Sequence, residues 1–433
     1  MRMRMLDRLA GMKGQFGPDA ARRTVALLEK LRETRLRDPA DLIRLHEVVL
    51  FLRAYPQSSR VMRLADETLF SFSERLPADH DPFADPDISG IAGTVISTNF
   101  SYGFARSLVT RHGPAISIDW ENFEHPERLA PALTRLIPAS RDDWAVEAYP
   151  DWRGWFEKGR GSVKWLVDNL TPEMYDLIEI PIHWEPGDSS RSQLRLPRRK
   201  IFYHDGPFLK REPNLIAKML AAPPIPREIL GTEWACRIAD VIVDASAVRY
   251  RELYGFLHPD LARIEYAYLG RGIDVFVFAP ALKHQLPVRD YLCGMFFKNG
   301  VPIGYIEGLI RDGNMEVGFN LYYTFRDGET AWLYAMLLKL CKELSAVTTF
   351  SVDPYQIGHD NEEAIESGAF WFYRKLGFAP ESKDALRLLA SEEHKIVAQR
   401  GYRTPASTLR KLSRSRLLLP APCGAANFGG SLL

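Results

Sequence analysis

The spacing of apolar residues changes several times between about Asp274 and Phe378, and each change predicts a new element. Short runs rich in β-branched and aromatic residues predict three strands, at 274–278, 292–298 and 302–310. Asn299-Gly300 separates the last two runs and is the strongest short hairpin signal available, and Arg311-Asp312-Gly313-Asn314 predicts a second turn after them. From Met315 to Leu321 apolar and polar residues alternate with a period of two, which is typical of a half-buried strand.

Helical spacing follows this strand region. After Gly328, apolar residues recur at the period of a helix, and the expected core face is Leu333, Leu337, Leu340 and Leu344. Thr348 to Val352 predicts one more strand, and Asn361 to Phe378 predicts one amphipathic helix. Asn361 is its expected N-cap and Gly377 its left-handed stop. The expected apolar face of that helix is Ile365, Gly368, Ala369, Phe372 and Leu376.

This order of hairpin, strand, turn, helix, strand, loop and helix, with Tyr373 near the end of the last helix, resembles the GNAT superfamily of acyl-CoA-dependent N-acyltransferases. The resemblance covers about Tyr291 to Pro380. It implies a mixed sheet flanked by helices, and acetyl-CoA or another acyl-CoA as co-substrate. A tyrosine at the place of Tyr373 often protonates the departing CoA thiolate in that family. An asparagine at the place of Asn361 often helps to hold the pantetheine arm.

The family's phosphate loop reads Gln or Arg, two residues, Gly, one residue, then Gly or Ala. Here Arg326 and Ala331 match the two ends, but the middle glycine is displaced to Gly328 and Glu329 stands in its place. Backbone N–H groups at such a loop approach a pyrophosphate, and the helix N-terminus adds a favourable dipole. A glutamate would restrict that approach and add like charge, or would point to solvent as a first-turn residue.

The resemblance implies roles for further residues. The backbone of Asn320, Leu321 and Tyr322 would grip pantetheine and polarise the thioester carbonyl. The residues expected to meet the pyrophosphate are Arg326, Gly328, Thr330 and Ala331. The base for the amine would be Glu316 or Glu307 on the sheet. The implied reaction moves an acyl group, acetyl in the first instance, to a small-molecule or peptide amine.

Two other functions stay open. Glu329 in the phosphate loop favours a non-catalytic scaffold or ligand-sensing protein that keeps the fold alone. The basic cluster Arg198-Arg199-Lys200 favours an aminoacyl-tRNA-dependent transferase, because relatives of the same fold use aminoacyl-tRNA.

The whole chain is expected to be α+β. A helical subdomain is predicted at 1–78, a Pro- and Asp-rich linker at 79–86, and a mixed α/β region at 88–223, with a strand at Leu177–Trp184. The GNAT-like domain is expected at 230–390. The predicted last part, 395–433, is a basic, flexible tail, because it carries Lys and Arg residues and no acid.

Composition narrows the classes of partner. The formal net charge of +1 gives no global field for nucleic acid. The four cysteines have neither CxxC nor CxxH spacing, so neither a zinc site nor a disulfide framework is expected. No apolar run approaches the ~18 residues that span a bilayer, and no signal peptide is recognised. A soluble, cytoplasmic protein is expected.

Overall fold

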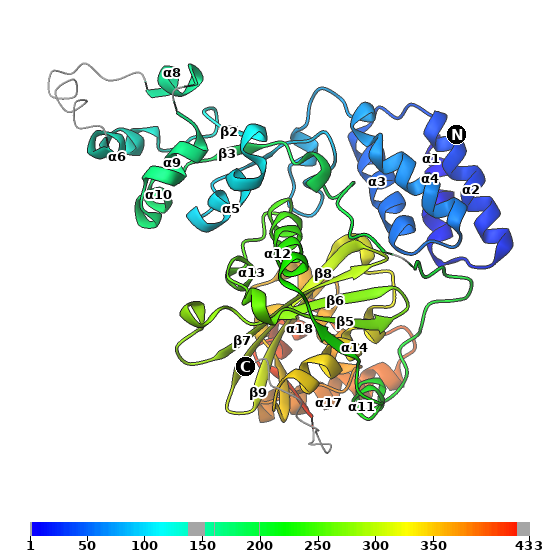
Figure 1. Cartoon of the computed structure of the whole chain (residues 1–433). Coiled ribbons are helices and arrows are strands. Elements are labelled where there is room, and N and C mark those ends of the chain that lie inside the picture. Colours follow the sequence, from blue (N-terminus) through cyan, green and yellow to red (C-terminus); the bar gives the residue numbers. More distant parts are fainter. Residues whose placement is uncertain (1, 137–151, 160, 199, 422–433) are drawn as a thin grey trace. The chain divides into compact units, whose positions relative to one another are not determined.

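The structure, a computed structural model, describes residues 2–136, 152–159, 161–198 and 200–421 (Figure 1). The chain forms two compact units, and each interrupts the other in sequence. Unit 1 contains Met1–Gly206, Glu233–Leu257 and Gly300–Pro302, and unit 2 contains Pro207–Thr232, His258–Asn299 and Ile303–Leu433. The predicted boundaries differ from this division. The segment 79–86 is not a linker between domains, because it lies inside unit 1 and buries Phe83.

Unit 1 begins with four helices, α1 (Arg2–Gly11), α2 (Pro18–Glu33), α3 (Pro39–Ala54) and α4 (Ser59–Phe70). Two of them have a side-chain cap at the N-terminus. The Asp38 carboxylate accepts the N–H of Ala40 at 2.8 Å at the start of α3, and Ser58 caps α4. The helical subdomain predicted from sequence is therefore present as helices.

The rest of unit 1 is built around a three-stranded antiparallel sheet in the order β1-β3-β2. Its strands are β1 (Ile96–Thr98), β2 (Ile116–Ile118) and β3 (Ile182–Trp184), and its helices are α5 (Tyr102–His112), α6 (Leu129–Leu136), α8 (Trp152–Glu157), α9 (Val163–Asn169), α10 (Pro172–Ile178), α12 (Thr232–Ala247) and α13 (Tyr254–Leu257). The strand predicted at Leu177–Trp184 is wrong in its first part, because Leu177 and Ile178 are the last residues of α10. Helix α12 adds Val243 and Ala247 to the core of this unit, although its sequence was expected to belong with the C-terminal domain.

Unit 2 is a nine-stranded mixed sheet with helices, in the order β11-β12-β10-β9-β8-β7-β6-β5-β4. Its strands are β4 (Arg227–Ile229), β5 (Glu265–Gly270), β6 (Ile273–Phe278), β7 (Asp290–Lys298), β8 (Val301–Arg311), β9 (Asn314–Leu321), β10 (Thr349–Val352), β11 (Ala379–Pro380) and β12 (Leu417–Pro420). Its helices are α11 (Leu215–Leu220), α14 (Thr330–Leu344), α15 (Glu362–Glu366), α16 (Ala369–Arg374), α17 (Lys383–Ala398) and α18 (Ala406–Leu412). The predicted α+β class is thus confirmed at the level of a mixed sheet with helices.

The turns of this sheet follow from the residues at their tips. Asn299 and Gly300 both have positive φ, at 49° and 82°, between β7 and β8. Asp312 and Gly313 repeat that pattern between β8 and β9. Two successive positive φ values match the right-handed twist of the flanking strands, which is why these dipeptides form tight hairpins. The two predicted turns are therefore confirmed.

The segment predicted as one helix from Asn361 to Phe378 consists of two short helices. Gly368 has a left-handed backbone, with φ at 69°, and separates α15 from α16. Its effect is to shift the helical phase, so that the second helix buries Phe370 and Tyr373 instead of Ala369 and Phe372. Both predicted ends are correct, because Asn361 accepts the N–H of Ala364 at 3.1 Å and Gly377 has a φ of 108°.

The expectation of a flexible tail from residue 395 onward is wrong as far as residue 421. The last turn of α17, helix α18 and strand β12 occupy this stretch, and β12 lies between β10 and β11. Two of its arginines form ion pairs within unit 2, Arg410 with Glu362 and Arg416 with Glu381. The positive charge that indicated a solvated tail is thus partly matched by acids that are distant in sequence.

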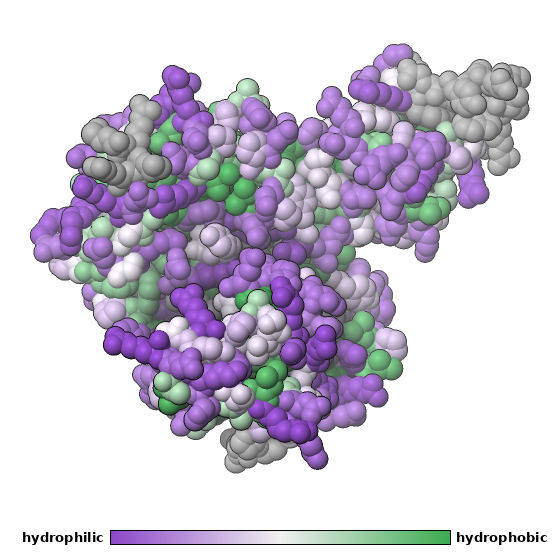
Figure 2. Space-filling model, turned by 180° about the vertical axis from the view of Figure 1, so that it is seen from behind, coloured by the Kyte–Doolittle hydropathy of each residue, from purple (hydrophilic) through white to green (hydrophobic). Residues whose placement is uncertain are grey.

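Among the described residues, no helix is long and apolar enough to cross a membrane. On the face that Figure 2 shows, apolar residues are scattered among hydrophilic ones.

Candidate functional site

A cavity of about 440 Å³ in unit 2 brings together six of the residues that the sequence nominates. Strand β9, the 3₁₀ turn Pro354–Ile357, the start of α14 and the helices α15 and α16 enclose it. The nominated residues that line it are Asn320, Leu321, Arg326, Thr330, Asn361 and Tyr373. Further lining residues include Phe319, Gln356 and Glu363.

The cavity lies where two parallel strands separate. Strand β10 pairs with β9 only as far as Ser351, opposite Glu316, whereas β9 continues to Leu321. Along a strand, the backbone N–H and C=O of one residue point to one edge, and those of the next residue point to the other edge. The N–H of Phe319 and the carbonyl of Val317 face this open edge, since both bond to the side chain of Gln356. By the same alternation, the N–H of Leu321 faces it as well.

Tyr373 is the buried acid of this cavity. Its side chain is 4% exposed and packs edge-on against Tyr334 of α14, with ring centroids 5.6 Å apart. Its hydroxyl donates to Oε1 of Gln356 at 3.4 Å. Burial raises the pKa of Tyr373 above that of a free tyrosine, so its hydroxyl keeps its proton at neutral pH.

The N-terminus of α14 lies at the other end of the cavity. Thr330 is its first residue, and the N–H groups of the first turn have no partner within the helix. The Arg326 guanidinium pairs with Glu363 at 2.7 Å, and both side chains are exposed. Such an exposed pair is weak, so an anion at the helix start can compete for the arginine.

The side chain of Glu329 does not reach this cavity, contrary to both arrangements that the sequence suggested. It is 3% exposed, and its carboxylate pairs with Arg271 at 2.6 Å and accepts the N–H of Leu209 at 2.9 Å. The negative charge expected at the phosphate loop is therefore turned inward and neutralised. Arg271 belongs to the turn between β5 and β6, and nothing in the local sequence around Glu329 indicates this partner.

Neither glutamate nominated as a base lines the cavity. Glu316 lies among Arg289, Arg311 and Arg416 in another pocket. Glu307 accepts the hydroxyl of Tyr291, and burial raises the pKa of its carboxyl. Paired residues of neighbouring strands share a face of the sheet, and Glu307 pairs with Gly318. Because Phe319 follows Gly318, its side chain points to the opposite face from Glu307.

Three other nominated residues contribute nothing to the lining. The N–H of Tyr322 donates to the carbonyl of Ile303 at 2.9 Å, so it cannot polarise a ligand carbonyl without breaking that bond. The N–H of Gly328 donates to Phe325, and Ala331 follows Thr330 in the first turn of α14. Of the edge donors, the sequence nominated Leu321 but not Phe319, and it did not indicate Gln356. The alternation of β9 could have indicated Phe319, but no local signal indicates Gln356.

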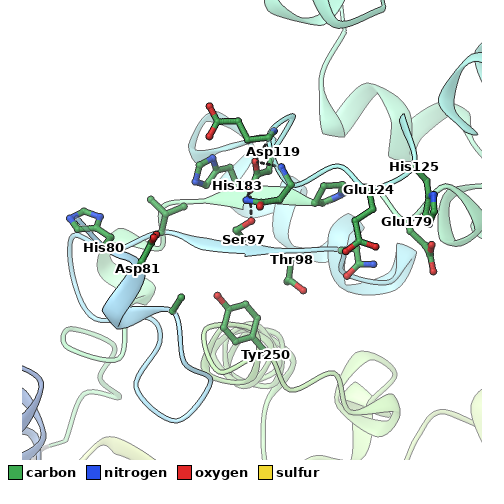
Figure 3. Close-up of a pocket in the computed structure, with 16 residues that line it drawn as sticks. His80, Asp81, Ser97, Thr98, Asp119, Glu124, His125, Glu179, His183 and Tyr250 are labelled. Atoms are coloured by element: carbon green, nitrogen blue, oxygen red, sulfur yellow. Dashed lines mark hydrogen bonds between the residues drawn. The ribbon is translucent and has the colours of Figure 1, made fainter. Parts of the chain in front are cut away.

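A second pocket, of about 620 Å³, lies in unit 1 (Figure 3). Ser97 of β1 pairs across the sheet with His183 of β3, and Asp119 follows β2 directly. Burial alone would raise the pKa of Asp119, but hydrogen bonds from Asn122 and Ser97 and the nearby His183 hold it below its usual value. Tyr250 enters from the end of α12, with a left-handed φ of 52°.

The charges around this second pocket are mostly negative. Five carboxylates and three histidines line it, and no lysine or arginine is among its described lining residues. Such a lining favours a cation or an amine over an anion. The Asp119 carboxylate already accepts four hydrogen bonds, however. The donors are the Ser97 hydroxyl of β1, the Asn122 side-chain amide and the backbone N–H groups of Glu121 and Asn122. We interpret Asp119 as a residue that organises this loop.

A buried Ser-His-Glu arrangement also occurs in unit 1. His46 Nε2 lies 2.8 Å from Ser192 Oγ, and its Nδ1 lies 3.1 Å from the Glu47 carboxylate. This is the order of a hydrolytic triad. His46 and Ser192 are fully buried, however, and Ser192 Oγ accepts the N–H of Ala92. Because Ser192 is buried and cannot meet a substrate, we interpret the arrangement as structural.

Comparison of the chain with protein-family models, curated proteins and solved structures finds no significant match. Within the described ranges, no group of three His, Cys, Asp or Glu residues is arranged to hold a metal ion.

Proposed function

We propose that unit 2 is an N-acyltransferase of the GNAT type, which moves an acyl group from acyl-CoA to an amine. One observation carries the proposal. A single cavity holds a buried tyrosine hydroxyl, the open edge of β9 and the N-terminus of α14 beside Arg326. An acid, an amide-binding edge and an anion site are the three features that a thioester on a pantetheine-phosphate arm requires.

The roles follow from the chemistry of each group. The open edge of β9 supplies the N–H groups of Phe319 and Leu321, one to bind an amide of the pantetheine arm and the other to stabilise the negative charge that develops on the thioester oxygen. The amine nitrogen forms the new C–N bond, the C–S bond breaks, and the Tyr373 hydroxyl supplies the proton that the departing thiolate takes. Arg326 and the first turn of α14 bind the pyrophosphate. Glu329 does not oppose this binding, because Arg271 holds its carboxylate.

Glu307 is the better candidate for the base that takes the proton of the amine. Its carboxyl has a raised pKa, caused chiefly by burial, which brings it closer to neutrality. It also stands opposite Gly318, which has no side chain to screen it from the edge of β9. The half-buried Glu316 lies beside arginines instead.

The test is ligand stabilisation followed by turnover. CoA at about 100 times its dissociation constant should stabilise the protein by ~2.7 kcal/mol and raise its melting temperature. Tyr373→Phe should slow acyl transfer to a panel of amines by about 100-fold while CoA affinity stays the same. An absence of any shift with millimolar CoA or acetyl-CoA would overturn the proposal. Binding without transfer to any amine would favour the ligand-sensing alternative.

A further inference from the structure

The side chain of Gln356 takes the place of a missing strand along β9. Its Nε2 donates to the carbonyl of Val317 at 2.9 Å, and its Oε1 accepts the N–H of Phe319 at 3.3 Å. In a parallel sheet, one residue of the neighbouring strand makes this same pair of bonds, to the residues on either side of its partner. The carboxamide of Gln356 therefore stands opposite Gly318, where β10 has already left the sheet.

The same oxygen also holds the acid of the site. The Tyr373 hydroxyl donates to Oε1 of Gln356 at 3.4 Å. One side-chain atom thus accepts both the edge N–H of Phe319 and the hydroxyl of Tyr373, two of the donors that the proposed site offers to acyl-CoA. Gln356 comes from the 3₁₀ turn Pro354–Ile357, whose start is fixed by the Asp353 carboxylate accepting the N–H of Tyr355.

We propose that Gln356 is a built-in competitor for the acyl-CoA ligand. A secondary amide on an extended chain, such as either amide of a pantetheine arm, offers the same acceptor and donor as the Gln356 carboxamide. The ligand and the side chain therefore compete for the Val317 carbonyl and the Phe319 N–H, and binding requires the side chain to rotate out of the edge. This inference rests on the proposed function, because it concerns the same cavity.

If Gln356 competes with the ligand, its removal changes CoA affinity in the opposite direction from the removal of a residue that contacts the ligand. Removing a residue that touches the ligand weakens binding, whereas removing a competitor strengthens it. Gln356→Ala and Gln356→Met should each bind CoA about tenfold more tightly than the unaltered protein, since the hydrogen bonds that the Gln356 carboxamide makes no longer have to be broken. Gln356→Met keeps the length and most of the volume of the side chain, so it controls for any change in binding that the empty space left by Gln356→Ala would cause.

The experiment is titration calorimetry of the full chain with CoA, together with amide hydrogen exchange at Phe319. Tighter binding by both variants, with faster exchange of the Phe319 N–H before CoA is added and protection after, is the expected result. Equal or weaker CoA binding by both variants, with binding intact in the unaltered protein, would overturn the inference and leave the proposed function standing. No CoA binding by any of the three proteins would overturn both.

Discussion

Arg271 and Glu329 form an ion pair whose atoms approach to 2.6 Å, and the glutamate is almost fully buried. The pair joins the turn between β5 and β6 to Glu329, the N-cap residue of α14, 58 positions further along the chain. It neutralises the Glu329 carboxylate, whose charge the sequence set against phosphate binding at this helix. A buried pair of this kind is costly to break on one side, because the remaining charge stays uncompensated.

The first prediction concerns this pair. Arg271→Met should destabilise the protein by about 3 kcal/mol, since it leaves the Glu329 carboxylate buried without its partner. Arg271→Met combined with Glu329→Gln should recover most of the loss, because no buried charge remains. Urea unfolding of the single and double variants measures both effects. A double variant as unstable as the single one would contradict the role assigned to the pair.

A second prediction distinguishes what the phosphate end of the site contributes to CoA affinity from what the edge of β9 contributes. Arg326→Ala should lower CoA affinity by about tenfold, because a charge-assisted contact to phosphate is lost. Glu363→Gln should raise affinity about two- to threefold, since it frees Arg326 from an exposed and therefore weak pair. Calorimetry with CoA measures both changes. Pantetheine, which lacks the pyrophosphate, is the matched control, and its affinity should not respond to either substitution.

A third prediction concerns acid stability and His46. Burial lowers the pKa of His46 below its ordinary value of 6.5. The unfolded chain therefore takes up a proton near pH 6.5 that the folded chain accepts only at lower pH. The stability that neutral His46 contributes is complete above pH 6.5 and is lost as the pH falls toward the folded pKa, by up to about 1.4 kcal/mol per pH unit.

The measurement is urea unfolding at several pH values between 5 and 7.5. The difference in unfolding free energy between the unaltered protein and His46→Gln should change with pH over this window, because only the histidine titrates. A difference that stays constant across the window would show that the folded protein accepts the proton as readily as the unfolded chain.

A fourth prediction compares two glycines beside the candidate site. A Cβ at Gly304 would lie 2.2 Å from the carbonyl oxygen of Asn320, whereas a Cβ at Gly318 would lie 3.6 Å from the Cβ of Glu307. Gly304→Ala should cost about 2 kcal/mol or more, since it forces the β8–β9 ladder apart, and Gly318→Ala should cost less than about 1 kcal/mol. Thermal unfolding of the two variants measures the contrast. Similar melting temperatures would mean that the ladder adjusts freely at Gly304.

Local sequence was enough for features that depend on neighbouring residues. The turns at Asn299-Gly300 and Asp312-Gly313 required residues that tolerate positive φ, and the strand from Met315 to Leu321 required alternation. The cap at Asn361 was predictable for the same reason, because its partner, the Ala364 N–H, lies three residues away. The break at Gly368 was not predicted, because glycine adopts both negative and positive φ and the sequence alone does not tell which one occurs within a helical pattern.

The tertiary structure decided which side chains meet. Arg271 reached Glu329, and Gln356 reached the edge of β9, through a sheet topology that no local pattern records. The stretch that holds α18 and β12 looked like a solvated tail because its charges are all of one sign, yet their partners Glu362 and Glu381 lie some 35 to 50 positions earlier. The sequence by itself therefore determined the order of elements from β6 to β10 and pointed to Tyr373. The fold determined what surrounds that tyrosine, because burial and hydrogen bonding depend on residues brought together across the chain.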